Sequence, residues 1–148
     1  MNTHPYLRAY LAGIFVPTFV LPLILTVFIV VRIVLKAPVP IELAMIFPMA
    51  VVPMLFGLWN MLWLCSHAHT HLPIGLHGAI LPLLMMPAGA CVGSCLGVLS
   101  FGSNGVIWFQ ACQWPYALIA IILLVGLAVY YLGWKYIVGF LNRVLGIA

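Results

Sequence analysis

The chain has 148 residues, of which 67% are hydrophobic and only 4% are charged. Because about a quarter of the residues of a typical soluble domain are charged, this composition excludes an ordinary soluble fold. The formal net charge of +4 comes from five basic residues and one acid. The basic residues are scattered at the edges of apolar runs, so they indicate head-group anchors rather than a nucleic-acid surface.

Four apolar segments are long enough to cross a membrane, since a helix needs about 20 residues to span the hydrocarbon core. Helices are expected over residues 10–34, 41–64, 77–99 and 116–138. Helices are favoured over strands because the runs are unbroken and a helix satisfies its own backbone in lipid. The sequence therefore predicts an all-α fold, a four-helix transmembrane bundle that forms a single domain over residues 1–148.

An even number of spans places both ends of the chain on the same side of the membrane. That side would carry Arg8, Lys135 and Arg143, whereas the opposite side would carry Arg32 and Lys36. The positive-inside rule therefore predicts a multi-pass protein with cytoplasmic termini.

The longest connection, over residues 100–115, combines a turn with an apolar stretch. Ser103-Asn104-Gly105 is typical of a turn, and residues 106–109 are too apolar for a free loop. We expect this connection to lie in the membrane interface, where tryptophan and tyrosine side chains settle.

Prolines recur as pairs with the spacing P-x-x-x-x-P in the first three predicted helices. The pairs are Pro17 and Pro22, Pro48 and Pro53, and Pro82 and Pro87. Each proline removes a backbone donor and crowds the preceding turn, so each helix is expected to bend there. The bends either surround a cavity or pathway, or fit the helices to one another and to a larger partner.

A ridge of small residues runs along the third predicted helix. Gly89, Gly93 and Gly97 recur at four-residue steps. Such a pattern lets the backbone of another helix approach closely. The ridge is therefore expected to be a packing face, either for another helix of this chain or for a second subunit.

The strongest polar feature is a group of four histidines between the second and third predicted helices. They are His67, His69, His71 and His77. Neutral imidazole is the commonest metal ligand and also ligates haem iron. If the second helix continues, His67 and His71 share one face, and His77 would fold back toward them. The group either binds a transition metal or haem, or is a polar loop that meets head groups, water or a partner protein.

Other polar residues are few. Asn60, between two tryptophans, is expected to hydrogen-bond to a neighbouring helix or to lipid head groups. Glu42 is the only acidic residue, so the paired carboxylates of a hydrolase are missing. The cysteines form no C-x-x-C pair and are interpreted as small apolar residues rather than as a disulfide framework.

These features favour a small non-catalytic membrane protein, a lipid-embedded subunit of a larger membrane complex such as a redox or energy-transducing one. Its expected partners are the lipid bilayer and either other membrane subunits or further copies of itself. Two alternatives stay open. One is a metal- or haem-binding protein that uses the histidine group, and the other is a small homo-oligomeric channel or transporter.

Overall fold

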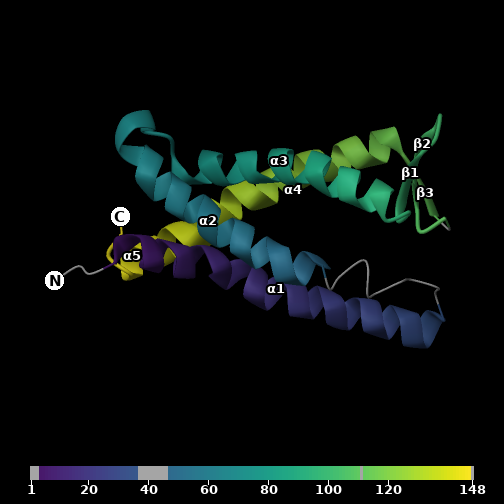
Figure 1. Cartoon of the computed structure of the whole chain (residues 1–148), viewed down its shortest axis with the longest axis horizontal. Helices are drawn as coiled ribbons and strands as arrows, with labels where there is room; N and C mark the ends of the chain where they lie inside the picture. Colours follow the sequence, from purple (N-terminus) through teal and green to yellow (C-terminus); the bar gives the residue numbers. More distant parts are fainter. Residues whose placement is uncertain (1–3, 37–46, 111, 148) are drawn as a thin grey trace.

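The computed structural model describes residues 4–36, 47–110 and 112–147. Within these ranges the long helices are α1 (Pro5–Leu35), α2 (Phe47–Thr70), α3 (Ile74–Cys95) and α4 (Tyr116–Leu132). A π-helical segment, η2 (Gly133–Val138), and a short helix, α5 (Gly139–Val144), continue α4 (Figure 1). Counting α4, η2 and α5 as one run, the described residues contain four helices long and apolar enough to span a membrane. The predicted all-α transmembrane bundle is confirmed.

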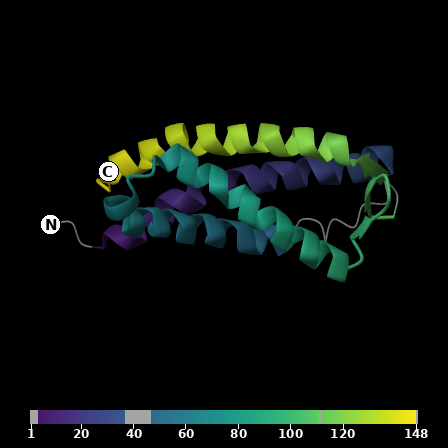
Figure 2. The ribbon, with the colours of Figure 1, turned by 90° about the horizontal axis from the view of Figure 1, so that it is seen from above.

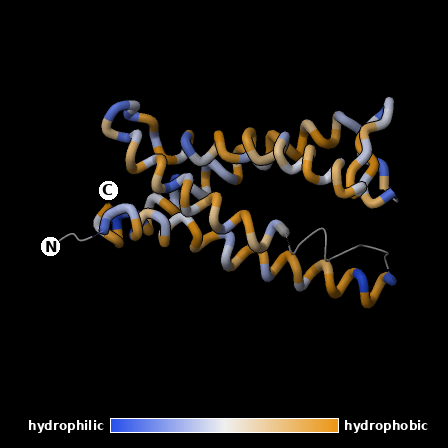
Figure 3. The backbone as a smooth tube through the Cα atoms, viewed as in Figure 1, coloured by the Kyte–Doolittle hydropathy of each residue, from blue (hydrophilic) through white to orange (hydrophobic). Residues whose placement is uncertain are grey.

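Apolar residues cover the length of the helices, whereas polar residues gather at their ends (Figure 3). The connection between α2 and α3 and the last turn of α1 are among the most hydrophilic stretches. The start of α1 and the end of α5 lie at the same end of the bundle (Figure 1). This arrangement fits a multi-pass membrane protein, and the compartment of the termini stays a prediction.

The helix boundaries differ from the predicted ones around the histidine group. The helix predicted over residues 41–64 runs on to Thr70, and its predicted start lies outside the described residues. Pro73 stands just before the first turn of α3, where its missing N–H is harmless, so α3 begins at Ile74 rather than at residue 77. His67 and His69 therefore lie on a helix rather than in a loop. The other predicted boundaries shift by a few residues, with α1 starting at Pro5.

A small antiparallel sheet occupies the connection between α3 and α4. Its strands are β1 (Leu99–Phe101), β2 (Gly105–Trp108) and β3 (Cys112–Pro115), in the order β1-β2-β3. The predicted turn is confirmed between β1 and β2, where the Gly102 N–H donates to the Gly105 carbonyl oxygen at 2.9 Å. The strands were not predicted, because runs of three or four residues are too short to show an alternating pattern.

The four helices form two pairs that meet at one end of the molecule. α1 packs along α2 and α3 packs along α4, and the two pairs diverge toward the sheet (Figure 1). All four helices follow the same long axis when the molecule is turned by 90° (Figure 2). We call the end with the α2–α3 connection the closed end, and the end with the sheet and the last turn of α1 the open end.

The helical core lies at the closed end. Its centre is formed by Phe56, Leu81, Trp134 and Val138. Among the described residues, none of α1 is buried after Pro17, none of α3 after Pro82, and none of α4 at all. The helices of the open end therefore lack a core of their own.

Prolines mark the border between the two ends. Pro17 and Pro82 are the last buried residues of α1 and α3. Pro53 lies one turn before Phe56, the first residue of α2 that the structure describes as buried. Pro48 is the second residue of α2 that the structure describes, and Pro53 lies inside the helix.

Candidate functional site

The four histidines of the predicted group occupy two different environments. His67 lies near the end of α2, where its ring packs on Trp63 with 4.6 Å between the ring centroids. His69 and His71 are exposed at or just beyond the end of the same helix. His77 instead lies in the first turn of α3 and is buried. The structure thus places His77 inside the bundle and the other three on its surface.

His77 is held between α2 and α3 by reciprocal contacts with Trp59. The two rings stack with 4.6 Å between their centroids. The Trp59 indole N–H donates to the His77 carbonyl oxygen at 2.8 Å, and Nε2 of His77 lies 2.9 Å from the Trp59 carbonyl oxygen. Because a carbonyl oxygen only accepts hydrogen bonds, this geometry requires the hydrogen on Nε2. The imidazole therefore acts as a packing and hydrogen-bonding group.

The predicted metal or haem site has no preformed ligand set in the described ranges. Within residues 4–36, 47–110 and 112–147, no three His, Cys, Asp or Glu side chains are grouped so that they could hold a metal ion. His67 and His69 are two residues apart on one helix, so they point to different sides of it. The metal or haem hypothesis stays a prediction to which this geometry adds no support.

A buried pair of asparagines lies at the centre of the closed end. Asn60 of α2 and Asn142 of α5 are fully buried and exchange two hydrogen bonds of 2.8 and 3.1 Å between their side-chain amides. The Asn60 amide also donates to the carbonyl oxygen of Ala9 in α1 at 2.8 Å. The expectation that Asn60 bonds to a neighbouring helix is confirmed, and the pair connects three helices. Asn142 was not singled out from the sequence, because nothing in its apolar surroundings shows which residue it faces.

Arg8 adds a further connection at the closed end. Its Nη1 donates to the carbonyl oxygen of Leu145, just after α5, at 2.6 Å. Its Nε and Nη2 atoms are enclosed and have no hydrogen-bond partner in the part of the chain that the structure describes. We call Arg8, Asn60, His77 and Asn142 the closed-end polar cluster.

Trp134 fills the space beside this cluster from the π-helical segment η2. It is almost fully buried, and its ring lies against Phe56 and His77, with 5.8 and 6.1 Å between the ring centroids. A side chain at Gly78 would collide with the Trp134 ring, so only glycine lets α3 approach this closely. Within residues 4–36, 47–110 and 112–147, Nε1 of Trp134 has no hydrogen-bond partner.

The predicted glycine ridge does not form one continuous face within the described chain. Gly89 and Gly97 face open space, whereas a side chain at Gly93 would collide with Leu99 of β1. Gly97 also lies beyond the end of α3, in a left-handed conformation with φ of 68°. The association of a partner through this ridge stays a prediction.

The closed-end polar cluster holds helices together. The hydrogen bonds described for it connect α1 to α2, α2 to α3, α2 to α5, and α1 to the segment after α5. The rings found against His77 are two tryptophans, and these provide neither a nucleophile nor a carboxylate for acid–base chemistry. No protein family, curated protein or solved structure compared with the chain matches it.

Proposed function

We propose that the chain is a non-catalytic, lipid-embedded subunit of a larger membrane complex, and that its open end packs against a helix of a partner subunit. The observation that carries this proposal is the border at which burial stops. A self-sufficient bundle packs its helices along their whole length. Here the border is formed by Pro17, Pro53 and Pro82. The buried helical residues that the structure describes are Pro17, Pro82 and residues on the closed-end side of this border.

The inner face of α1 shows the change most directly. Ala9 and Ala12 are buried at the closed end. Val27 and Val30 lie 18 residues further on, which is five helical turns, so they follow on the same face. Their side chains are 62% and 52% exposed. On a regular helix, the face of α1 that carries Ala9 and Ala12 therefore continues through Val27 and Val30, and the side chains at these positions are covered at one end and more than half exposed at the other.

The same change occurs on α3. Leu81 is 3% exposed and belongs to the core, whereas Val92, about three turns later on the same face, is 37% exposed. Transmembrane helices associate through close packing and hydrogen bonds, because lipid provides no hydrophobic driving force between them. The apolar face of α3 around Val92 continues the face that packs at Leu81, but no described helix covers it. It is therefore suited to pack against a helix from another subunit.

A photo-crosslinking comparison on α1 tests the proposal in the native membrane. A photoreactive amino acid is placed at Val27 or Val30, on the inner face, and at Ile29 as the control. Ile29 has the same depth in the membrane and points to the opposite side of the helix, since residues two apart differ by about 200°. We expect Val27 and Val30 to give one discrete adduct with a transmembrane peptide of another protein, and Ile29 to give only lipid adducts.

Three outcomes would count against a complex with other subunits. Equal adducts from Val27 and Ile29 would show that the inner face has no special partner. Adducts between two copies of this chain would instead favour the homo-oligomeric alternative. Migration of the gently solubilised chain as a single small species on native gels, without any crosslinked partner, would also remove the proposal.

A further inference from the structure

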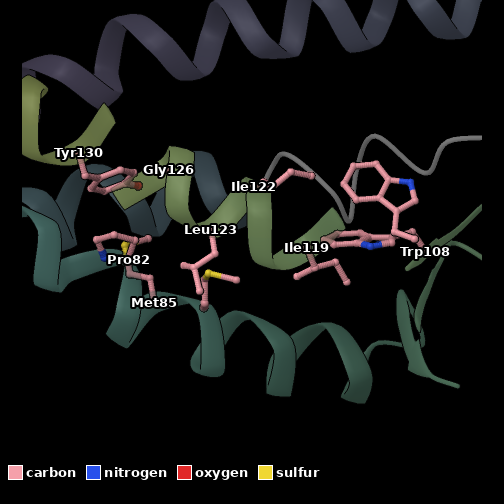
Figure 4. A pocket seen from close by; sticks show the side chains of 10 residues that line it. Pro82, Met85, Trp108, Ile119, Ile122, Leu123, Gly126 and Tyr130 are labelled. Atoms are coloured by element: carbon pink, nitrogen blue, oxygen red, sulfur yellow. The ribbon is translucent and has the colours of Figure 1, made fainter. Parts of the chain in front are cut away.

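An apolar groove runs between α3 and α4 up to the sheet (Figure 4). Its volume is about 410 Å³, which lies within the usual range of about 300 to 1,000 Å³ for small-molecule sites. α3 contributes Pro82 and Met85, α4 contributes Leu123 and Gly126, and β2 contributes Trp108. The groove lies between the helices of one pair, so it is separate from the inner surface proposed above for a partner helix.

The groove is long relative to its volume. Along α4 its lining extends from Ile119 to Tyr130, a rise of about 16 Å at about 1.5 Å per residue. Gly126 lies in the middle of this stretch, and a side chain added there would meet nothing within 4 Å. A narrow space that runs parallel to a membrane-spanning helix suits a hydrocarbon chain better than a compact ligand.

A hydrogen-bond donor without a partner lies at the sheet end of the groove. Nε1 of Trp108 is enclosed and has no hydrogen-bond partner among the described residues, whereas the neighbouring Trp114 donates its indole N–H to Sγ of Cys112 at 3.3 Å. The two rings lie together, with 5.6 Å between their centroids. Tryptophans gather at the level of the lipid head groups, where the ester carbonyl groups of phospholipids also lie. A rotation of the Trp108 ring would offer this N–H to an acceptor from outside the chain.

We infer that this groove is a binding site for a bilayer phospholipid. One acyl chain lies along α4 from Trp108 toward Tyr130, and its ester carbonyl oxygen accepts a hydrogen bond from Nε1 of Trp108 after a rotation of the indole. The groove has the direction of an acyl chain, because it follows a helix that crosses the membrane. It also begins beside the tryptophans, where the glycerol region of a lipid lies.

The test uses the full chain in nanodiscs that contain a phosphatidylcholine with a diazirine near the middle of one acyl chain. After illumination, labelled peptides are mapped by mass spectrometry. We expect labelling to concentrate on residues 82–86 and 119–126, above the level on the exposed outer face of α1. Gly126→Leu fills the groove and should reduce the labelling there to the level of that outer face. Gly89→Leu is the matched control, because Gly89 also faces open space but does not line the groove.

A second pair of variants tests the proposed hydrogen bond. Trp108→Phe keeps an aromatic ring but removes the donor, and should lower the groove labelling about two- to tenfold, the effect of one ordinary hydrogen bond. Trp114→Phe removes the same ring area from the lining of the groove but a donor that already has a partner, so it should lower the labelling less than Trp108→Phe does. Circular dichroism and gel filtration confirm that all four variants remain folded.

Three results would overturn the inference. Uniform labelling of all lipid-exposed helices would show that lipid is present only as bulk solvent. Displacement of the lipid label by a low concentration of an isoprenoid quinone would show that another carbonyl-bearing amphiphile occupies the groove. Chain-to-chain adducts at residues 119–126 would show that a second copy covers it.

Discussion

The closed and open ends of the molecule are built from the same four helices but differ in what lies between them. At the closed end, a side chain at Gly13 would collide with the backbone of α2, and one at Gly78 with the ring of Trp134. At the open half of the helices, a side chain at Gly89 or Gly126 would meet nothing within 4 Å. Glycine therefore permits close helix contact at Gly13 and Gly78 and borders free space at Gly89 and Gly126.

The difference shows which interactions hold transmembrane helices together. Both ends are strongly apolar, so apolarity places both in the membrane but does not decide where helices touch (Figure 3). The closed end adds two features that the described helices of the open end lack, glycines in close contact with another helix and buried side-chain hydrogen bonds between helices. The helix pairs meet where these features are present and diverge where they are absent.

The largest effect is expected from filling the space at Gly78. Gly78→Ala places a methyl group against the Trp134 ring and should lower the free energy of unfolding by about 1–3 kcal/mol, as overpacking usually does. Gly89→Ala is the control and should be neutral or stabilise by up to about 1 kcal/mol, because alanine favours a helix. Both values come from unfolding titrations with sodium dodecyl sulphate in mixed micelles. Equal losses for the two variants would remove the distinction between the ends.

A smaller effect is expected from the asparagine pair. Asn60→Leu leaves Asn142 and the Ala9 carbonyl oxygen without this partner, and should cost about 0.6–1.7 kcal/mol on the scale measured for polar contacts within membranes. The double variant Asn60→Leu/Asn142→Leu should cost less than the sum of the two single variants, because each single change already breaks the shared bonds. Strict additivity in the same unfolding titration would show that the pair contributes nothing as a pair.

The smallest effect is expected at the surface histidines. His67→Gln together with His71→Gln should change the free energy of unfolding by no more than about 0.5 kcal/mol, since both side chains are exposed. His4→Gln is the exposed control at the start of α1. Melting curves are recorded with and without a chelator. If the chelator lowers the melting temperature of the original chain but not of the double variant, the metal hypothesis regains support, because a bound ligand stabilises the folded state.

The spans could be predicted because they depend on hydropathy alone. α1 and α4 each begin or end within a few residues of their predicted limits. Pro73 is the last residue of the connection between α2 and α3, at a position where the start of a helix tolerates proline. The sheet and the divergence of the helix pairs could not be predicted. Three short strands give no periodic signal, and an apolar run carries no information about which helix it will face.

Only part of the candidate site could be predicted from the sequence. Asn60 stood out as a polar residue in an apolar helix, but its partner is 82 positions away in the chain. The histidines are close in sequence and were therefore interpreted as one group. However, α2 ends at Thr70 and α3 begins at Ile74, just after Pro73, so the group is divided between two helices. His77 therefore enters the bundle and stacks on Trp59, while the others stay on the surface.

The π-helical segment η2 has a consequence for the direction in which α5 points. A π-turn holds one residue more than an α-turn, and one residue corresponds to about 100° of rotation around the helix axis. Every residue after η2 is therefore turned relative to a regular continuation of α4. A regular α-helix with the same number of residues would turn Asn142 about 100° away from Asn60, so the extra residue held in Gly133–Val138 keeps the hydrogen bonds that connect α1, α2 and α5. Removing one residue from this segment would restore a regular helix and leave the Asn142 amide directed at Asn60.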